Sequence, residues 1–481
     1  MANYYAVCVK PSCLWTEETL IDKRIDAHFY SIKYMQYYNK LMKCKIKKMS
    51  LYNICSRMNS GPFGSALLAS QYVDKGVAFI RPLNCKDYIV DIDNDVVFIS
   101  KEDSERLKSS KFSSGDLIFT KIGNGIGDVA IIPQKIFECN ISGNLMGVKV
   151  KNNIDNYYVL TFLKSIYGQN QIWQGMMNSA KPKIDMDTLK SIVIPIPSPE
   201  IQKYIGDKVR KAEELREEAK RLKKEAEEIL NRELNLNKLK ESLKSSINSK
   251  HNWITSMDIN DRIDSYYYKR RYILVNQHLN DYECIQIRDI ASVDYGYMPT
   301  EDYADENNGV PLIRVTNMIG NLLLDLSDLK YINKSINIPD DKYVDDGDIL
   351  VVQCGNTTGK IALMTKEVEN YLYPSFCLRI KLKNKSINNK YLALLMEMSI
   401  IQEQIWQSAS YSSVRPNTTK PAIENIRIPL IEKQKQEDVG VLVEKYIDNI
   451  YQSKQLIQEA KQDVEDLIEG NFDMSKVRAN S

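Results

Sequence analysis

The sequence predicts a duplicated α/β (α+β) protein, in which two tandem mixed α/β domains are each followed by a long helix. Three observations support this class. Five sequence blocks recur in the same order at offsets between 232 and 238 residues. Each copy combines short β-branched runs with longer helical stretches. Each copy then ends in a long charged segment that lacks internal proline. A repeat of this length determines how the rest of the sequence is interpreted.

Length and composition limit the class of protein. A chain of 481 residues is too long for one hydrophobic core. The apolar fraction of 43% and the charged fraction of 27% are typical of globular proteins in solution. No apolar run is long enough to cross a membrane, and the N-terminus lacks the pattern of a signal peptide, so we expect a cytoplasmic protein.

Charge and metal-binding residue types exclude further classes. The net charge of +2 argues against indiscriminate DNA binding but permits a local basic surface. The nine cysteines are scattered and only three histidines are present, so no zinc-site spacing occurs. We expect reduced thiols, no metal and no cofactor in this chain.

The repeat begins at residues 21–30 and 259–268, which share Arg-Ile-Asp followed by aromatic residues. It continues through an Ile-Arg block, a Gly-Asp strand opening, a Gly-rich loop, a Gln-Ile-Trp-Gln block and an Ile-Pro exit. The later blocks align Arg81 with Arg314, Gly115 with Gly347, Gly123 with Gly355, Trp173 with Trp406 and Pro195 with Pro429. Chance similarity would not keep five blocks in order, so the two halves arose by duplication.

The same elements are predicted in the same order in both copies. Residues 115–119 and 347–352 are short apolar runs opened by Gly-Asp, which indicates strands. Further strands follow each Gly-rich loop, at 129–132 and 361–364. Residues 156–173 and 389–406 are helical by pattern. The Ile-Pro exits at 192–197 and 426–431 suit edge strands or extended segments.

The segment after Pro199 predicts one long helix from Glu200 to about Ile247. It contains mostly strong helix formers. About 45 residues would span about 70 Å. From Ala212 onward the apolar positions repeat at the 3,4 spacing of a coiled coil.

A second helix is predicted from Gln434 to about Glu469. Neither helix can bury its apolar stripe alone, so we expect an antiparallel coiled coil with pseudo-two-fold symmetry. A solvated linker helix is the alternative. The predicted stripe comprises Ala212, Leu215, Ala219, Leu222, Ala226 and Ile229 in the first helix, and Val443, Ile450, Ile457 and Val464 in the second.

These patterns divide the chain into five segments. The first globular domain covers residues 1–197, and the first long helix covers 198–250. The second domain covers 251–430, and the second long helix covers 431–472. A short tail, 473–481, follows.

No catalytic motif is present. Neither a dinucleotide-binding nor a phosphate-binding glycine loop occurs, and the motif of amino-methyltransferases is missing. The acidic cluster at Pro339–Asp341, Asp345, Asp346 and Asp348 could hold a nuclease metal. The first copy has only Asp116 in common there, so a solvated turn before a strand is the better interpretation.

The Gly-rich loops at 121–128 and 353–360 are the best candidates for ligand contact. Glycine allows close backbone approach, and Asn, Gln, Thr and Lys contact base edges or phosphates. A tight hairpin turn is the alternative. The two copies keep the glycines but change the polar residues, as two readers of different DNA sequences on one scaffold would.

The order of these blocks resembles the specificity subunit of type I restriction–modification systems. The resemblance runs from about Asp22 to about Glu469 and includes the Gln-rich helix entries at 200–202 and 433–436. Single blocks are unspecific, but the duplicated arrangement with two long helices is highly specific. Two features depart from the family. When the two copies are aligned, Pro197 and Pro199 match Ile431 and Lys433, so the second copy lacks both prolines. Lys454 and Lys461 occupy positions in the apolar stripe of the second long helix.

The resemblance implies a function. Each globular domain would be a target recognition domain that reads one half of a split, asymmetric site in double-stranded DNA. The helices would set the spacer and dock two methyltransferase subunits, which carry S-adenosylmethionine and methylate adenine. The resemblance also admits a restriction subunit that cleaves unmodified DNA. The chain itself would be non-catalytic.

The candidate DNA-binding residues lie in the loops and at the matched arginines. In the first domain they are Ser60, Phe63, Ser65, Arg81, Lys121, Asn124, Lys181 and Lys183. In the second they are Tyr295, Tyr297, Thr300, Arg314, Asn317, Gln353, Asn356, Thr357, Lys360, Ser412, Ser413 and Arg415. Lys181, Lys183 and Lys360 fit phosphate contacts.

Matched arginines carry two interpretations. Arg81 and Arg314 could contact DNA or could form a structural ion pair within the repeat. The pairs Arg24–Asp26 and Arg262–Asp264 are interpreted as structural, because identical pairs cannot discriminate two different half-sites.

Two other classes of function remain open. A duplicated scaffold could bind proteins, not DNA, through its coiled coil; co-purification with a methyltransferase and salt-dependent retention on DNA would argue against it. A solitary restriction enzyme would need catalytic motifs that the sequence lacks.

Overall fold

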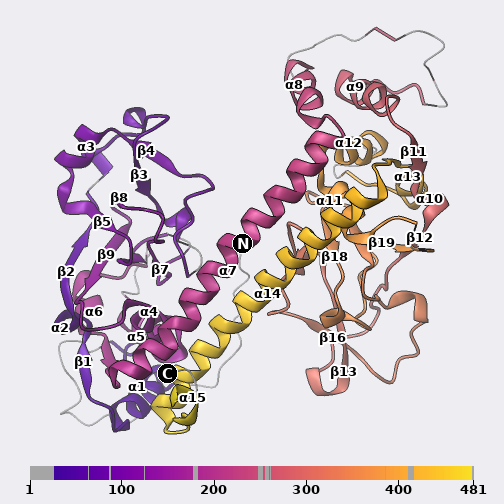
Figure 1. Cartoon of the computed structure of the whole chain (residues 1–481). Helices are drawn as coiled ribbons and strands as arrows, with labels where there is room; N and C mark the ends of the chain where they lie inside the picture. The colour runs from indigo at the N-terminus through magenta and orange to yellow at the C-terminus, as the bar shows by residue number, and fades with distance from the viewer. Residues whose placement is uncertain are drawn as a thin grey trace. The chain divides into compact units, whose positions relative to one another are not determined.

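The chain folds as two units that do not follow the linear domain boundaries. Unit 1 comprises Met1–Leu215 and Gln452–Ser481, and unit 2 comprises Arg216–Tyr451. The computed structural model describes residues 26–62, 64–85, 88–123, 125–176, 182–246, 253–254, 259, 262–384, 386–409 and 416–478. Both long helices, α7 (Pro199–Glu233) and α14 (Lys433–Glu469), contribute one part to each unit (Figure 1).

Unit 1 is a mixed α/β domain with two four-stranded sheets. One sheet has the order β2-β9-β6-β7 and the other β4-β3-β8-β5; β1 and β10 form a separate antiparallel pair. Its helices are α1 (Ile32–Lys43), α2 (Leu51–Ile54), α3 (Lys101–Arg106), α4 (Asn156–Lys164), α5 (Ile166–Gly175), α6 (Met186–Ser191) and α15 (Ser475–Arg478). Its strands are β1 (Lys48–Ser50), β2 (Cys55–Ser60), β3 (Val77–Ile80), β4 (Val97–Ile99), β5 (Lys111–Ser113), β6 (Leu117–Thr120), β7 (Val129–Ile131), β8 (Glu138–Ile141), β9 (Leu145–Val150) and β10 (Val193–Pro195).

Unit 2 repeats the first of these sheets. It has the order β12-β19-β17-β18, and β11 pairs with β20 as β1 pairs with β10. Its helices are α8 (Leu236–Ser246), α9 (Arg270–Leu279), α10 (Ile287–Ile290), α11 (Asn389–Glu397), α12 (Ser399–Ser408) and α13 (Lys420–Glu424). Its strands are β11 (Cys284–Gln286), β12 (Ala291–Tyr295), β13 (Gly309–Leu312), β14 (Met318–Gly320), β15 (Leu323–Leu324), β16 (Lys330–Asn333), β17 (Ile349–Val352), β18 (Ile361–Leu363), β19 (Cys377–Leu382) and β20 (Arg427–Pro429).

The two units confirm the duplicated mixed α/β class. The predicted strands after Gly-Asp and after the Gly-rich loops are β6, β17, β7 and β18. The two units differ outside this main sheet. Unit 1 has a second four-stranded sheet that contains the parallel β3–β8 pair, whereas unit 2 has two separate two-stranded ribbons, β13–β16 and β14–β15.

The predicted helices at 156–173 and 389–406 are each interrupted once. In unit 1 the break falls at Ser165, whose hydroxyl accepts the N–H of Gly168 and caps α5. In unit 2 the break falls at Met398. Each helix pair packs on its sheet, and the buried side chains include Tyr158 and Tyr391, which donate to the Pro195 and Pro429 carbonyls.

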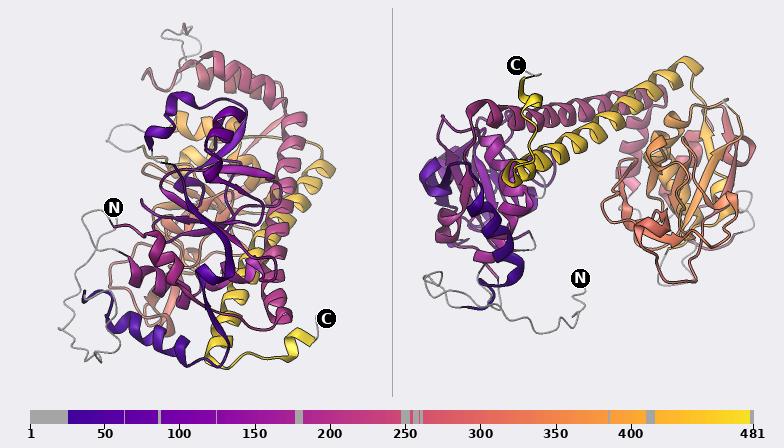
Figure 2. Two further views of the ribbon diagram at one scale, coloured as in Figure 1. Left: turned by 90° about the vertical axis from the view of Figure 1, so that its left-hand side faces the viewer. Right: turned by 90° about the horizontal axis from the view of Figure 1, so that it is seen from below.

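The long helices pair in the antiparallel sense that the sequence predicted. In unit 1, the beginning of α7 shares a core with the end of α14, and Lys208 pairs with Glu459 (3.2 Å) and Asp463 (2.6 Å). Figure 2 shows the yellow end of α14 beside the indigo α1 and the start of α7. In unit 2, the end of α7 shares a core with the beginning of α14, and Lys223 lies over the Tyr446 ring.

The first long helix is shorter than predicted. We expected one helix to about Ile247, but α7 ends at Glu233 and α8 begins at Leu236. Asn235 lies between them with a φ of 47°, a left-handed conformation that asparagine tolerates better than most residues. The helix formers on both sides hide this stop in the sequence, and α8 packs against α9 and does not extend α7.

The same polar contacts join each domain to its long helix. Gln202 donates to the Pro197 carbonyl and accepts the N–H of Asp155, and Gln436 makes the same contacts with Ile431 and Asn388. One turn later stands a glycine, Gly206 or Gly440. A Cβ at Gly206 would lie 2.5 Å from the Asp155 carboxylate, so the helix can approach this closely only without a side chain.

Candidate nucleic-acid interface

Loops from distant parts of the sequence open at one end of the main sheet in unit 1. The register pairs Ser60 with Met146, Thr120 with Leu145 and Phe119 with Val129. The chain therefore leaves β2 and β6, and enters β7 and β9, at the same end. We call residues 60–62, 121–123, 125–128, 142–144 and 182–184 loop face 1.

Backbone hydrogen bonds hold loop face 1 together. The N–H of Lys121 donates to the Asn144 carbonyl (2.8 Å), and the N–H of Ile184 donates to the Lys121 carbonyl (3.2 Å). The N–H of Gly61 donates to the Leu145 carbonyl (3.1 Å). The structure thus brings together segments that the sequence analysis had selected separately.

Unit 2 presents the equivalent end of its sheet. Tyr295 pairs with Leu378, Val352 with Cys377 and Val351 with Ile361. We call residues 295–300, 353–360, 374–376 and 416–420 loop face 2. The N–H of Gln353 donates to the Phe376 carbonyl (2.8 Å), and the N–H of Thr418 donates to the Gln353 carbonyl (2.9 Å).

Both Gly-rich loops are hairpin turns, and hydrogen bonds from the neighbouring strands and helices hold them in place. The N–H of Gly127 donates to the Thr120 carbonyl, and the N–H of Gly359 donates to the Val352 carbonyl. Each of these glycines has a φ of 86°. The Gln169 and Gln402 amides donate to the Gly127 (3.3 Å) and Gly359 (2.8 Å) carbonyls, so α5 and α12 hold the turns in place.

Four of the predicted residues of unit 1 fall on or next to loop face 1. Ser60 ends β2, Ser65 is exposed in a short 3₁₀ turn, Lys121 follows β6, and Lys183 is exposed. Their contact with DNA stays a prediction. Phe63, Asn124 and Lys181 lie outside the described residues.

Seven of the predicted residues of unit 2 lie on loop face 2, namely Tyr295, Tyr297, Thr300, Gln353, Asn356, Thr357 and Lys360. Tyr295 is 42% exposed, and its hydroxyl accepts the N–H of Lys420 (3.4 Å). Tyr297 and Thr300 both donate to the Glu301 carboxylate (3.1 and 2.8 Å). Contact of these residues with DNA also stays a prediction, and Ser412, Ser413 and Arg415 lie outside the described residues.

The hairpin of loop face 2 carries the remaining candidates. Asn356 is exposed, and Gln353 and Thr357 are half-buried. The ammonium of Lys360 donates to the Met318 carbonyl (3.0 Å). A phosphate contact by this ammonium would compete with that hydrogen bond. Asn356 is therefore the most exposed candidate residue of this hairpin.

Arg81 and Arg314 each bind the backbone of a loop within their own unit. The Arg314 guanidinium donates to the carbonyl (2.5 Å) and carboxylate (2.6 Å) of Asp328, and Arg81 donates to the Asp95 carbonyl (2.5 Å). An asparagine three residues later, Asn84 or Asn317, adds further hydrogen bonds to the same loop. Asn317, which is 3% exposed, accepts the Arg314 N–H and donates to the Asp325 carbonyl. These contacts agree with the structural interpretation. Among the described residues, Arg314 forms an ion pair with Asp328, whereas Arg81 donates to a backbone carbonyl.

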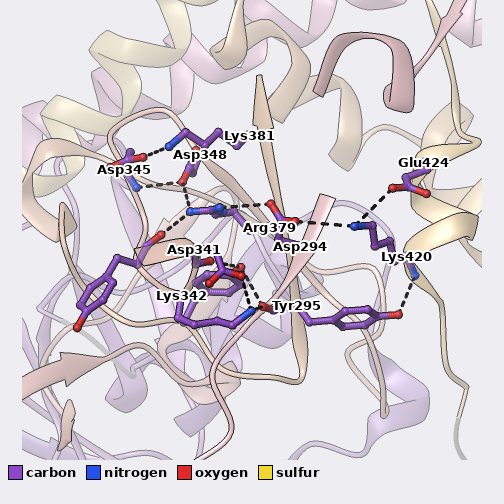
Figure 3. Close-up of polar contacts among 12 residues, drawn as sticks. Asp294, Tyr295, Asp341, Lys342, Asp345, Asp348, Arg379, Lys381, Lys420 and Glu424 are labelled. Atoms are coloured by element: carbon purple, nitrogen blue, oxygen red, sulfur yellow. Dashed lines mark hydrogen bonds and ion pairs between the residues drawn. The ribbon is translucent and has the colours of Figure 1, made fainter. Parts of the chain in front are cut away.

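A buried charge network lies beneath loop face 2 (Figure 3). The Arg379 guanidinium pairs with Asp294 (3.3 Å) and Asp348 (3.6 Å) and donates to the Tyr343 carbonyl (2.5 Å). Burial raises the pKa of the Asp348 carboxyl to about 6, although the Asp345 N–H and Arg379 act against that rise. This network anchors the strand ends that carry Tyr295.

The acidic cluster is divided by these contacts. Asp341 pairs with Lys342 (2.7 Å), and Asp345 pairs with Lys381. Lys342 also donates to the Tyr295 carbonyl (2.9 Å), which ties this turn to loop face 2. Asp348 is buried, so the interpretation of the whole cluster as a solvated turn is wrong for this residue. In the part of the chain that the structure describes, no three His, Cys, Asp or Glu residues form a group that could hold a metal ion.

A family model decides the identity of the fold. The model for the type I restriction modification DNA specificity domain matches twice, over residues 74–228 and 279–462. These two matches fall in the two copies and together cover more than half of the chain. The chain belongs to this specificity-domain family. The match confirms the resemblance predicted from the repeat.

Solved structures similar to this specificity chain include two subunits of the same kind. The type I restriction–modification S subunit from M. genitalium has 12% identity and a TM-score of 0.46, with 90% of this chain and 97% of that chain covered. The HsdS subunit from Thermoanaerobacter tengcongensis has 13% identity and a TM-score of 0.29, with 89% and 97% covered. No match is found among curated proteins.

The helix stripe of the specificity chain is used within the chain. Ala212, Ile457 and Val464 belong to the core of unit 1, and Ala219, Leu222, Ala226 and Val443 to that of unit 2. Ile229 and Ile450 are half-buried against the unit 2 core, and Leu215 is half-buried. A partner protein would therefore meet other faces of the helices. No helix among the described residues has the length and apolar character that a membrane crossing requires.

Sequence reasoning missed several residues of the two loop faces. Asn144 and Phe376 occupy equivalent positions directly before β9 and β19, and both are exposed. Lys420 of loop face 2 donates its backbone N–H to the Tyr295 hydroxyl, and Lys342, which lies next to this face, donates its ammonium to the Tyr295 carbonyl. Alignment of the copies through β9 and β19 could have identified Asn144 and Phe376, because the flanking strands match while these two residues differ.

Proposed function

We propose that this chain is the sequence-specific DNA-binding subunit of a type I restriction–modification complex. Loop face 1 would read one half of a split site, and loop face 2 would read the other. The observation that carries the proposal is the double family match on two units that share one scaffold. On that scaffold the hairpin residues Lys121 and Gln353 stand at equivalent positions but differ in chemistry, as two different half-sites require.

Partner subunits follow from the same proposal. Two methyltransferase subunits would dock on the exposed charged faces of α7 and α14, since the apolar stripes are already buried. S-adenosylmethionine would be bound by those partners. The chain would direct catalysis without performing it, and a restriction subunit would join where the complex also cleaves DNA.

Replacement of Asn356 and Lys360 by Ala tests the assignment of loop face 2. We expect relaxed recognition in one half-site only, because Asn356 would contact a base edge and Lys360 a phosphate. Loss of a bidentate base contact would reduce discrimination by about 1–3 kcal/mol, and loss of the phosphate contact would lower the salt dependence of binding by about one unit of slope.

The measurement is a genome-wide methylation map of cells that express each variant with the methyltransferase. The matched control is Lys366→Ala, an exposed lysine that follows β18 at the end of the sheet opposite to loop face 2 and lies on neither long helix. Equal relaxation of both half-sites, or none, would contradict the assignment. Absence of DNA methylation with the unaltered chain would contradict the proposed function itself.

Shortening the two long helices tests the spacer role. Deletion of seven residues from α7, with a matched deletion of seven from α14, would shorten both by about 10 Å at 1.5 Å per residue while keeping the stripe in register. We expect the two half-sites to be unchanged and the number of bases between them to fall. The same methylation map measures this spacing, and an unaltered spacer in a folded variant would rule out the ruler role.

A further inference from the structure

One position of each loop face combines equivalent backbone contacts with very different side chains. In unit 1 it is Asn144, whose carbonyl accepts the Lys121 N–H (2.8 Å). In unit 2 it is Phe376, whose carbonyl accepts the Gln353 N–H (2.8 Å). Both residues close a turn into the central strand, through Leu145 N–H to Ser142 and Cys377 N–H to Pro374 (2.9 Å each).

The backbone of Phe376 takes part in hydrogen bonds, while the residue is exposed to solvent. Its side chain is 53% exposed, although the neighbouring Cys377 is fully buried in the core of unit 2. The preceding residue is also fixed, because the Ser375 N–H donates to the Tyr297 carbonyl (2.8 Å). A single exposed aromatic residue is common on protein surfaces, so its meaning here comes from its position between Gln353 and Tyr297.

Asn144 is exposed at the matching point of loop face 1. Within the described part of the chain its side-chain amide makes no hydrogen bond. Asparagine can form a paired contact with the N6 and N7 atoms of adenine, whereas phenylalanine can pack on the methyl group of thymine. Equivalent backbone positions would thus carry side chains with different base preferences.

We propose that Asn144 and Phe376 are a matched pair of base-reading residues. Asn144 contacts an adenine edge in the half-site of loop face 1, and Phe376 packs on a thymine methyl group in the half-site of loop face 2. This inference rests on the proposed function and adds to it the residues that make the two half-sites different. Neither residue belongs to the buried network that supports the fold.

Selection from a randomised pool of double-stranded DNA tests the pair with the purified full chain. The unaltered chain should enrich a two-part motif. Phe376→Asn should change one or two adjacent positions in one part, and Asn144→Phe should change one or two in the other. The control is Phe137→Asn, since Phe137 is 89% exposed but follows β7 at the opposite end of the sheet from loop face 1.

Replacement of thymine by uracil gives a second measurement that a structural role would not affect. Uracil lacks only the methyl group, so the unaltered chain should bind about fourfold more weakly when uracil replaces thymine at one position of the motif. This factor corresponds to about 0.8 kcal/mol per buried methylene-sized group. Phe376→Asn should bind both DNAs equally, and Phe376→Leu, which keeps an apolar side chain, should retain part of the difference.

The possible outcomes separate the two proposals. If the unaltered chain enriches no motif, the proposed DNA-binding function is overturned, and this inference with it. If the unaltered chain enriches a motif that folded Phe376→Asn and Asn144→Phe variants keep, the pair has no reading role although the function stands. If Phe137→Asn alters the motif as strongly, the effect is not specific to the loop faces and the inference fails.

Discussion

Removal of residues 452–481 is expected to unfold unit 1 while unit 2 stays folded. This segment supplies Ile457, Val464, Leu467 and Ile468 to the core of unit 1, where they pack with the beginning of α7. Four buried aliphatic side chains at about 1.5–3 kcal/mol each stabilise by about 6–12 kcal/mol. That sum is comparable to the whole stability of a typical domain, about 5–15 kcal/mol. Unit 2 ends at Tyr451 and keeps its core.

Hydrogen exchange measured by mass spectrometry distinguishes the two units. In the truncated chain, peptides from β6, β9 and α4 should exchange rapidly, while those from β17, β19 and α11 remain protected. Truncation after Asn471 is the control, because it keeps all four aliphatic residues. Val464→Asp provides a full-length test, since it places a charge in the same core. Persistent protection of β6 and β9 in both variants would show that unit 1 folds without the second long helix.

This division also shows which parts of the fold could be predicted from the sequence. The repeat and the 3,4 spacing predicted two domains and two pairing helices, because periodicity survives in the sequence. The sequence could not show that each core takes apolar residues from both helices. Leu230 is fully buried in unit 2 although the predicted stripe stopped at Ile229, because a straight α-helix drifts from the coiled-coil repeat. Leu234 is also fully buried, but it lies in the turn after α7, which the sequence analysis had predicted to be helical.

The candidate site was predictable in its location more than in its individual roles. Turn glycines and flanking strands indicated the hairpins at 121–128 and 353–360, since these are local signals. The role of Arg314 was left open, because its partner Asp328 lies across a loop whose path depends on tertiary structure. Phe376 was missed because an aromatic residue between strands is usually assigned to the core. Only the register of β19 places it on loop face 2.

The buried network of unit 2 illustrates the same limit. Arg379 stands opposite Leu350 in the register, and the equivalent of this pair in unit 1 is Gly147 opposite Ile118. A Cβ at Gly147 would lie 2.3 Å from the Phe112 ring, so that copy fills the space with an aromatic residue and not with an ion pair. The copies therefore stabilise one sheet in two ways, and a substitution at Arg379 should affect unit 2 alone.

Arg379→Ala is expected to destabilise unit 2 by about 3–5 kcal/mol at pH 8, because removal of one partner leaves buried carboxylates without compensation. Asp348 is 3% exposed and Asp294 loses the same partner. Chemical denaturation followed by hydrogen exchange in β17 and β19 measures the loss. Arg288→Ala, an exposed arginine on α10, is the control and should change stability by less than about 0.5 kcal/mol.

The effect of Arg379→Ala should depend on pH in a defined direction. The pKa of Asp348 is about 6 in the folded chain, above about 3.9 for an ordinary aspartate, so the folded state binds this proton more tightly. Stability contributed by the bound proton is present below pH 4 and is lost as pH rises through 6. Arg379 lowers this pKa, so its removal raises the pKa further and makes stability fall more steeply between pH 5 and pH 8. The free energy of unfolding of the variant should therefore be closer to that of the unaltered chain at pH 5 than at pH 8.

The double variant with Asp348→Asn should recover part of the lost stability at pH 8. A destabilisation that is equal at both pH values, with no recovery in the double variant, would show that Arg379 acts through packing and not through its charge.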